Sequence, residues 1–276
     1  MYSKTALLLY TAKKAGIIKS NASFWRDFNN IDKLNSLNLN TEMEESHLKE
    51  NAINLTCVFD DNFPSTPSGL KPSEKPYLFA YKGDISLLKD RTKNMAVVGT
   101  LTPDGNIIAR EKEIIKKIVD MGFYVVSGLA LGCDTVAHSE TLAVNGKTIA
   151  FLPSALENIY PKSNKKLVDS ILSSGGLVIT EYINEPLNRY QSVSRFIERD
   201  RLQALFAANI ILIASSLPGK GDSGSRHAMA KAKDYNTNRF VMYNETTDND
   251  NPLFGLNRQL AESGVSILTA NELKNL

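Results

Sequence analysis

The sequence is poor in cysteine, with only Cys57 and Cys133 among 276 residues. They lie far apart and form no CxxC pair, which excludes a disulfide framework and a four-cysteine zinc site. This usage suits a reducing cytoplasm, where we expect the protein to act. His227 has no partner at a metal-ligand spacing, so we expect no metal and no cofactor.

Long apolar runs are also missing. No stretch approaches the roughly 18 apolar residues of a membrane helix, so we expect no membrane partner. The apolar residues 6–9 precede two lysines and no small-residue cleavage site, so we expect no signal peptide. Neither GxxxxGK[ST] nor a GxGxxG after the first strand occurs, so no sharp motif supports a nucleotide enzyme. The net charge of +2 argues neither for nor against nucleic acid.

Residues 95–138 contain the clearest structural pattern. The apolar runs 95–98 and 123–126 are rich in β-branched or aromatic residues, and each ends in a turn of small residues. Between them, isoleucine and valine recur at helical spacing. This predicts a βαβ unit with a right-handed crossover. Its two glycine turns lie at the carboxyl edge of the sheet, where open α/β sheets bind ligands.

Apolar runs and helical stretches alternate along the rest of the chain. We expect strands at residues 77–81, 95–98, 123–127, 148–152, 177–181, 210–214, 240–243 and 265–268. The alternation predicts an α/β fold, with an extended Rossmann-like, doubly wound and mostly parallel sheet. We expect a small N-terminal helical module at residues 1–52 and the Rossmann-like domain at residues 53–276.

Local patterns give three further expectations. Thr41 and Glu44 have the spacing of a helix capping box. The polar loop 244–251 is expected to be solvated. His138 follows Asp134 by four residues, which suits an acid–base couple, but we favour an N-cap aspartate and a structural histidine. We likewise favour packing over a nucleophilic role for Cys133.

The turns at the carboxyl edge predict an anion site. Glycines, hydroxyls and a helix start beside basic residues suit a phosphate. Residues 189–233 carry eight basic against three acidic side chains, with aromatic residues nearby. This combination favours single-stranded nucleic acid, although a solvated helix face remains open. The candidates from this reasoning are Gly99, Thr100, Lys220, Ser225 and Arg226.

The order of these motifs resembles the DprA/Smf family of DNA-processing proteins from about Leu55 onward. The similar segments are AVVGT at 96–100, SGLALGCD at 127–134, TIAFL at 148–152, Tyr160-Pro161, TEY at 180–182, RDR at 199–201 and SGS at 223–225. The resemblance implies a homodimeric, non-enzymatic protein that binds single-stranded DNA and delivers it to a RecA-type recombinase during natural transformation. It implies DNA contacts at Ser127, Gly128, Arg199, Arg201, Ser223 and Gly224.

The sequence departs from the family pattern in several places. The pattern has arginine at the positions of Leu101 and Leu131, and asparagine at the position of Asp200. Fewer positive charges weaken phosphate binding, because binding to phosphates depends on their neutralisation. No counterpart of the winged helix that some members carry is expected after residue 268.

A small-nucleotide pocket is the alternative. Rossmann-like proteins of the lysine-decarboxylase-like (LOG-related) group cleave nucleoside monophosphates. In that case Glu181 or Asp134 is the acid–base candidate, and Gly224 and Ser225 hold the phosphate. The PGGxGTxxE motif of that group is not matched, because no glutamate follows on the turn after Ser225.

Overall fold

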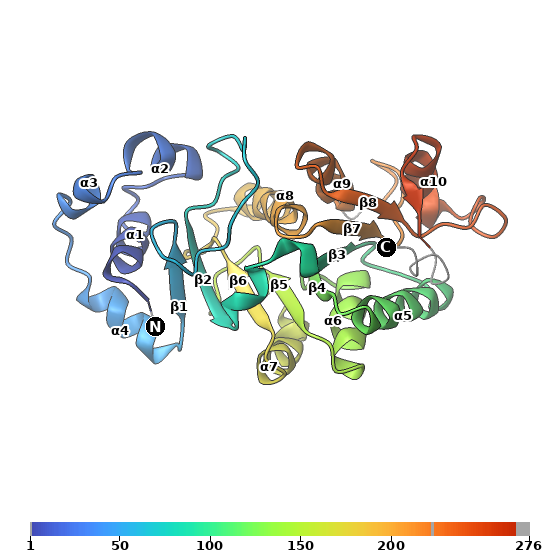
Figure 1. Ribbon diagram of the computed structural model, residues 1–276, viewed down its shortest axis with the longest axis horizontal. Helices are drawn as coiled ribbons and strands as arrows, with labels where there is room; N and C mark the ends of the chain where they lie inside the picture. Colours follow the sequence, from blue (N-terminus) through green and yellow to red (C-terminus); the bar gives the residue numbers. More distant parts are fainter. Residues whose placement is uncertain (1, 222–223, 269–276) are drawn as a thin grey trace.

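The computed structural model describes residues 2–221 and 224–268, which are built around one mixed sheet (Figure 1). The described strands lie in the order β1-β2-β6-β5-β4-β3-β7-β8-β9. Strand β2 pairs antiparallel with β1 and β6, and every other pair is parallel. The bounds are β1 Asn54–Cys57, β2 Leu78–Gly83, β3 Asn94–Val98, β4 Tyr124–Ser127, β5 Thr148–Phe151, β6 Leu177–Thr180, β7 Asn209–Leu212, β8 Asn238–Val241 and β9 Ser266–Ile267. This confirms the predicted α/β fold and its mostly parallel sheet.

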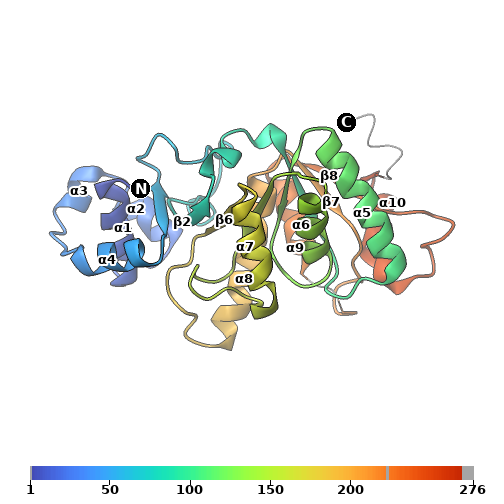
Figure 2. The same ribbon diagram turned by 90° about the horizontal axis from the view of Figure 1, so that it is seen from below.

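Helices cover both faces of the sheet (Figures 1 and 2). One face carries α5 (Gly105–Asp120), α6 (Cys133–Ala143) and α7 (Lys165–Ser173). The other carries α8 (Arg189–Leu205), α9 (Ser225–Asp234) and α10 (Gly255–Glu262). Short 3-10 helices occur at Ile85–Leu88, Arg91–Lys93, Lys162–Asn164 and Pro252–Phe254.

The strand order reverses beside β3. From β3 the chain moves through β4 and β5 to β6, then crosses by α8 to β7 on the opposite side of β3. The carboxyl ends of β3 and β7 are in register, with Val98 opposite Leu212. Open α/β sheets bind ligands at such a switch point, so the turns after these strands occupy the expected place for a site.

The N-terminal helices pack against the antiparallel edge of the sheet. They are α1 (Lys4–Lys14), α2 (Asn21–Asp27), α3 (Ile31–Asn35) and α4 (Glu42–Glu50). Phe24 of α2 is fully buried and stacks on Tyr77, with ring centroids 4.2 Å apart and an interplanar angle of 10°. Both rings belong to an apolar cluster that also contains Val178 of β6. The helices of residues 1–52 therefore share a core with the sheet.

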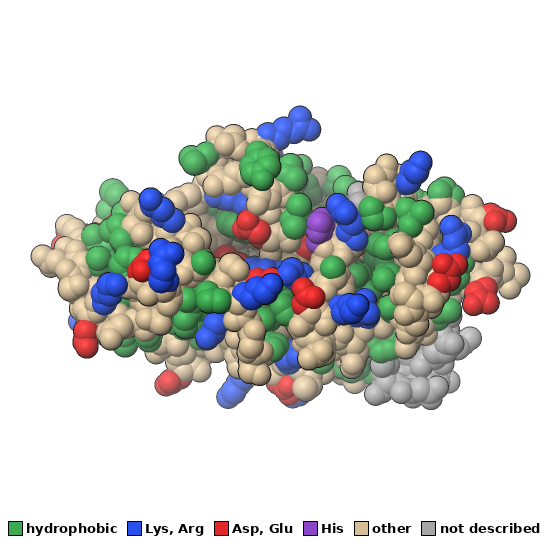
Figure 3. Space-filling view, turned by 90° about the horizontal axis from the view of Figure 1, so that it is seen from above, with side chains coloured by type: hydrophobic (Ala, Val, Ile, Leu, Met, Phe, Trp, Pro, Cys, Tyr) green, Lys and Arg blue, Asp and Glu red, His purple; other side chains and the backbone are tan. Residues whose placement is uncertain are grey.

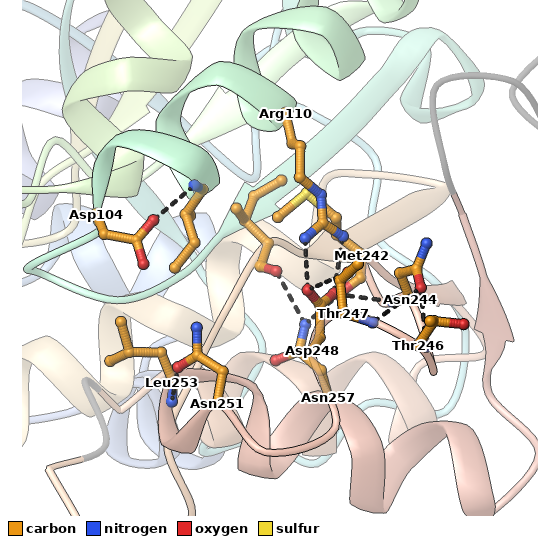
Figure 4. A network of polar contacts seen from close by, with 12 residues as sticks. Asp104, Arg110, Met242, Asn244, Thr246, Thr247, Asp248, Asn251, Leu253 and Asn257 are labelled. Atoms are coloured by element: carbon orange, nitrogen blue, oxygen red, sulfur yellow. Dashed lines mark hydrogen bonds and ion pairs between the residues drawn. The ribbon is translucent and has the colours of Figure 1, made fainter.

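The polar loop 244–251 is exposed at most of its positions, as expected, but Asp248 anchors it on α5 (Figure 4). Asp248 is 3% exposed, and its carboxylate accepts hydrogen bonds from both terminal nitrogens of Arg110, at 2.8 and 2.9 Å. The amide of Asn244 also donates to this carboxylate, at 2.8 Å. Nearby, the buried Asn257 amide donates to the carbonyls of Leu212, Ile213 and Met242, which fixes the ends of β7 and β8. The expectation of a solvated loop is confirmed at its exposed positions and was wrong at Asp248, whose charge has a partner far away in sequence.

Other local expectations also need correction. Residues 54–57 form β1, which we did not predict. The Thr41 side chain makes no capping hydrogen bond, and the Asn40 carboxamide oxygen accepts from the amide of Glu42 instead. Helix α6 begins at Cys133 after Gly132, so Asp134 lies inside the first turn and is not the N-cap.

Candidate nucleic-acid interface

The turns after β3 and β4 meet α8 and α9 at the carboxyl edge of the sheet. The Ser225 hydroxyl donates to the Gly99 carbonyl at 3.1 Å. A Cβ placed on Gly128 would come within 1.0 Å of Nη1 of Arg199, so the guanidinium lies directly against this glycine. A Cβ on Gly224 would lie 3.6 Å from the Asp200 carboxylate. This rim cluster contains the predicted residues Gly99, Thr100, Ser127, Gly128, Arg199, Gly224 and Ser225.

The turn after β4 already holds an anion from the protein itself. The Asp134 carboxylate accepts from the amides of Gly128 and Ala130, both at 3.2 Å. The Ser127 hydroxyl donates to the Val97 carbonyl at 2.7 Å. Successive amides in such a turn form an anion-binding nest, and the Asp134 carboxylate fills it here. The donors that we expected to hold a phosphate at Ser127 and Gly128 are thus engaged internally.

Arg199 forms ion pairs but leaves two of its nitrogens without a hydrogen bond to any described residue. Its side chain is only 4% exposed, with Nη1 3.6 Å from Asp134 Oδ2 and Nε 3.4 Å from Asp200 Oδ1. Across residues 2–221 and 224–268, neither nitrogen finds a hydrogen-bond acceptor. Buried N–H groups are rarely left in this state, because their desolvation is then uncompensated. Two nitrogens of this buried guanidinium thus have ion-pair partners but no hydrogen-bond acceptor among the described residues.

Two carboxylates flank this guanidinium and alter the charge of the rim. Burial raises the pKa of Asp200 to about 7, against the attraction of Arg199, and the carboxylate of Asp134 raises it further. Burial also raises the pKa of Asp134, again against the attraction of Arg199. Arg199, Asp134 and Asp200 together therefore carry little or no net positive charge near neutral pH.

Arg201 lies apart from the rim cluster. Its Nη2 is 2.7 Å from Oε2 of Glu181 in a buried ion pair. Asn21 donates to the same carboxylate at 3.0 Å, and Lys13 donates to the Glu181 carbonyl at 2.7 Å. These residues line a cavity of about 730 Å³ between the N-terminal helices and α8. Arg201 thus connects α8 to the N-terminal helices, whereas Arg199 faces the rim.

The remaining basic candidates are exposed. Lys220 lies in the loop after β7, and Arg226 lies in the first turn of α9. Ser223 lies outside the described residues. Figure 3, which looks onto the face of α8 and α9, shows lysines and arginines interspersed with acidic side chains. This face is therefore charged without being uniformly basic.

A cleft of about 300 Å³ opens beside Arg199. Its lining is Leu101, Gly128, Ala130, Leu131, Tyr160, Pro161, Phe196, Arg199 and Asp200. The rings of Tyr160 and Phe196 meet edge to face, with centroids 5.4 Å apart. We did not predict these two aromatic residues as site residues. The sequence signals for them were the Tyr-Pro pair of the family pattern and the aromatic residues near the arginine cluster.

His138 and Cys133 are both fully buried below the rim. Nδ1 of His138 lies 2.7 Å from the Thr148 hydroxyl, and burial lowers the pKa of this histidine to about 3. Burial raises the pKa of the Cys133 thiol well above its usual range, and the carboxyl group of Glu111 raises it further. A neutral histidine and an un-ionised thiol belong to the interior. The described residues contain no cluster of three or more His, Cys, Asp or Glu that is suited to a metal.

Comparison with known proteins identifies the family. Residues 54–275 match the family model for DNA recombination-mediator protein A. The chain belongs to the DprA/Smf family. The Smf protein of Synechocystis is 32% identical over 216 residues, which is 78% of this chain and 51% of that protein. DprA of Streptococcus pneumoniae is 31% identical over 179 residues, which is 64% of this chain and 60% of that protein. The chain thus spans between half and three fifths of these curated DprA/Smf proteins.

Solved DprA structures share this fold. The X-ray structure of DprA from Streptococcus pneumoniae aligns with a TM-score of 0.70 at 23% identity, covering 97% of this chain and 91% of that one. DprA from Helicobacter pylori, whose structure concerns its single-stranded DNA binding mode, aligns with a TM-score of 0.65 at 25% identity. That alignment covers 80% of this chain and 94% of the Helicobacter chain. No described helix of this DprA/Smf protein is both long and apolar enough to cross a membrane.

Proposed function

We propose that this DprA/Smf protein captures single-stranded DNA at the rim cluster without chemical turnover. As a recombination mediator it then delivers the strand to a RecA-type recombinase in the cytoplasm, and it acts as a homodimer. Family membership supports this class of function, and a relative from Helicobacter pylori is described in terms of single-stranded DNA binding. In the chain itself, the observation that carries the proposal is Arg199, buried at the rim with two nitrogens that find no hydrogen-bond acceptor among the described residues.

Capture at this rim is non-specific in sequence. The start of α9 lies at Gly224 and Ser225, where the positive end of a helix favours phosphate. The exposed Lys220 and Arg226 add charge nearby. Contacts of this kind fix the position of a strand on the protein, but they do not read its bases. A mediator that must accept any incoming strand requires this property.

Binding of a fluorescent oligothymidylate across a salt series tests the proposal, with duplex DNA as competitor. We expect a preference for the single strand and an affinity that falls as salt rises, because counterions are released from the phosphates. Binding that is insensitive to salt, or that favours the duplex, would contradict the proposal.

The variant Arg199→Gln with Asp200→Asn tests the site assignment. This double substitution keeps the net charge and avoids leaving Asp200 as an unpaired buried acid. We expect the affinity for oligothymidylate to fall by roughly 10- to 100-fold, the range for one or two hydrogen bonds from a charged donor. The control is Arg26→Gln on α2, where the side chain is 72% exposed and pairs with Asp27. If the double variant and the control bind oligothymidylate with equal affinity, the DNA does not bind at Arg199.

The two acid–base candidates for nucleotide cleavage, Glu181 and Asp134, are each held by other groups of the protein. Glu181 is bound by Arg201 and Asn21 at the large cavity, whereas Asp134 is bound by amides of the turn after β4. The two carboxylates therefore serve different parts of the fold. We expect a panel of nucleoside monophosphates to release no free base in the presence of the protein. Release of base would replace the binding role with an enzymatic one.

A further inference from the structure

The cavity between the N-terminal helices, the turn after β6 and α8 is separate from the cleft beside Arg199. Its volume of about 730 Å³ lies within the usual range for sites that bind small molecules. Among the described residues, the linings of the cavity and of the cleft have no member in common. The cavity therefore has a chemistry of its own, which the capture of DNA at the rim does not use.

The walls of this cavity are fixed by contacts between distant segments of the chain. Lys231 of α9 forms an ion pair with Glu74, which precedes β2. The indole N–H of Trp25 on α2 donates to the carbonyl of Lys75 at 2.8 Å. The short segment at residues 74–75 is thus attached to both α9 and α2. The cavity is therefore formed before any ligand arrives, as is usual for small-molecule sites.

Positive charge is in excess in this cavity. The lining contains five cations and three acids, namely Lys13, Lys19, Arg195, Arg201, Lys231, Glu74, Glu181 and Glu198. Glu181 is paired with Arg201, and Glu74 is paired with Lys231. Of the charged lining residues, this leaves three cations and one acid. The cavity therefore favours an anion, unlike the rim, where Arg199 lies between two acids.

Lys13 lies near the end of α1 and offers donors to such an anion. Its ammonium donates to the Glu181 carbonyl at 2.7 Å and lies 5.1 Å from the centre of the Tyr77 ring. An ammonium has three N–H donors, so one hydrogen bond leaves capacity for a ligand. Burial lowers the pKa of Lys13 to about 8 against the attraction of Glu181, and the charges of Arg201 and Arg195 lower it further. A bound anion would favour the charged form of this lysine.

The uncharged polar part of the lining suits hydroxyl groups. It consists of hydroxyl and carboxamide side chains, which can both donate and accept: Ser20, Asn21, Ser73, Asn184, Gln191 and Ser194. The Glu198 carboxylate is a further acceptor, held in place by the Tyr182 hydroxyl at 3.0 Å and the Ser194 hydroxyl at 2.8 Å. Isoleucine side chains at positions 18, 183 and 197 offer apolar contact to the C–H groups of a ring. The lining as a whole fits a small ligand with several hydroxyl groups and one anionic group.

We propose that this cavity binds a small polyhydroxylated anion, either a sugar phosphate or a sugar acid, with the anionic group beside Lys13 and Arg195. The hydroxyl groups of the ligand then lie against the carboxamides of Asn21 and Gln191. A phosphate and a carboxylate share the chemistry that these cations recognise. The site is independent of the proposed capture of DNA, so either can hold without the other.

The test compares glucose 6-phosphate, glucuronate and glucose, which differ only in carrying a phosphate ester, a carboxylate or a hydroxyl group at the terminal carbon. Thermal melting at constant ionic strength measures their binding, because a ligand of the folded state raises the melting temperature. We expect at least one of the two anions to raise it in a saturable way, and glucose to raise it much less. The anion with the larger effect identifies the anionic group. If none of the three raises the melting temperature, or if glucose acts as strongly as the anions, the proposal is overturned.

Lys13→Gln locates the anion within the protein. We expect this variant to bind the anion roughly tenfold more weakly or worse, the scale of one hydrogen bond from a charged donor. The matched control is Lys14→Gln, which changes the next residue of α1. The Lys14 ammonium lies 5.8 Å from the centre of the Tyr10 ring, and this residue does not line the cavity. Equal affinities of the two variants would overturn the placement of the anion beside Lys13.

Lys19→Glu provides an arm that does not disturb the core, because Lys19 is exposed at the edge of the cavity. Reversing this charge should weaken binding of the anion, since it removes an attraction and adds a repulsion. The control is Lys33→Glu, at an exposed lysine of α3 that does not line the cavity. This arm decides the question if Lys13→Gln does not fold. An affinity equal to that of the control would then overturn the proposal.

Competition with oligothymidylate separates this site from the rim. We expect a saturating concentration of the oligonucleotide to leave binding of the sugar anion unchanged. Displacement of the anion would place it at the rim and overturn the proposal. A protein that binds the anion but no oligothymidylate would contradict the proposed function and leave this site intact.

Discussion

The ionisation of Asp200 is expected to make the stability of the protein depend on pH. Its carboxyl group is buried beside Arg199 and has a pKa raised to about 7, compared with 3.8 for an exposed aspartate. Between about pH 4 and pH 7 the folded protein retains a proton that the unfolded chain has lost. The free energy of unfolding therefore falls as pH rises through this window, and the penalty is complete above pH 7.

We therefore expect Asp200→Asn to stabilise the protein, and more so at pH 8 than at pH 5. Asparagine keeps a polar group beside Gln203, which donates to Asp200 at 3.2 Å, but it cannot ionise. Thermal melting at the two pH values measures the effect. Asp169→Asn on the exposed side of α7 is the matched control, and we expect it to change the melting temperature little. A gain for Asp200→Asn that is equal at both pH values would show that the carboxyl group titrates normally.

The two arginines of α8 show what a sequence motif leaves undetermined. Arg199 and Arg201 belong to one three-residue motif, and both were expected to contact DNA. Residues two apart on a helix point in different directions, since neighbours on one face are three or four apart. Arg199 accordingly reaches the rim, and Arg201 reaches Glu181 beside the N-terminal helices. Helical geometry predicts the separation, but only the tertiary structure shows which arginine faces the rim.

At the scale of elements, the link between α5 and the loop 244–251 has the clearest energetic consequence. Arg110 forms a two-point contact with Asp248, whose side chain is 5% exposed. Removing one partner of a buried pair leaves an uncompensated charge. We expect Arg110→Ala to lower the free energy of unfolding by about 2–4 kcal/mol, somewhat less than for a fully buried pair because Arg110 is partly exposed.

Urea unfolding measures the loss of stability in Arg110→Ala, and Lys112→Ala on the same helix is the control. Lys112 lies 3.4 Å from Glu140, and its side chain is 52% exposed. Exposed pairs contribute about 0–1 kcal/mol, so Lys112→Ala should change little. Similar losses in both variants would show that the Arg110–Asp248 contact is no stronger than a surface pair.

The strands of the parallel sheet were predictable because each contains or adjoins a short apolar run, and the first two runs each end in a turn of small residues. The strands β3 to β8 lie at or within two residues of their predicted positions. Strand β1 was not predictable in this way, because Asn54 and Thr56 make up half of its four residues. Its identity as a strand depends on antiparallel pairing with β2, in which Leu55 lies opposite Ala80. Such long-range pairing is absent from any local pattern.

At the scale of the whole molecule, the N-terminal helices and the sheet share one apolar cluster. This cluster contains Phe24 of α2 and Val178 of β6. In addition, Lys13 and Asn21 both donate hydrogen bonds to Glu181, which follows β6. Residues 1–52 are therefore held by core contacts as well as by polar ones. We propose that they unfold together with the Rossmann-like sheet.

Trp25 tests this coupling, because it is the only tryptophan in the chain and lies in α2. Its indole N–H donates to the Lys75 carbonyl at 2.8 Å, so its fluorescence reports the contact between α2 and the segment before β2. We expect the urea transitions from Trp25 fluorescence and from far-ultraviolet circular dichroism to coincide, as in a single cooperative unit. Phe24→Ala should shift both transitions to lower urea together, because the lost packing, about 3–5 kcal/mol, belongs to the shared core. A fluorescence transition that precedes the dichroism transition would instead make residues 1–52 a separate folding unit.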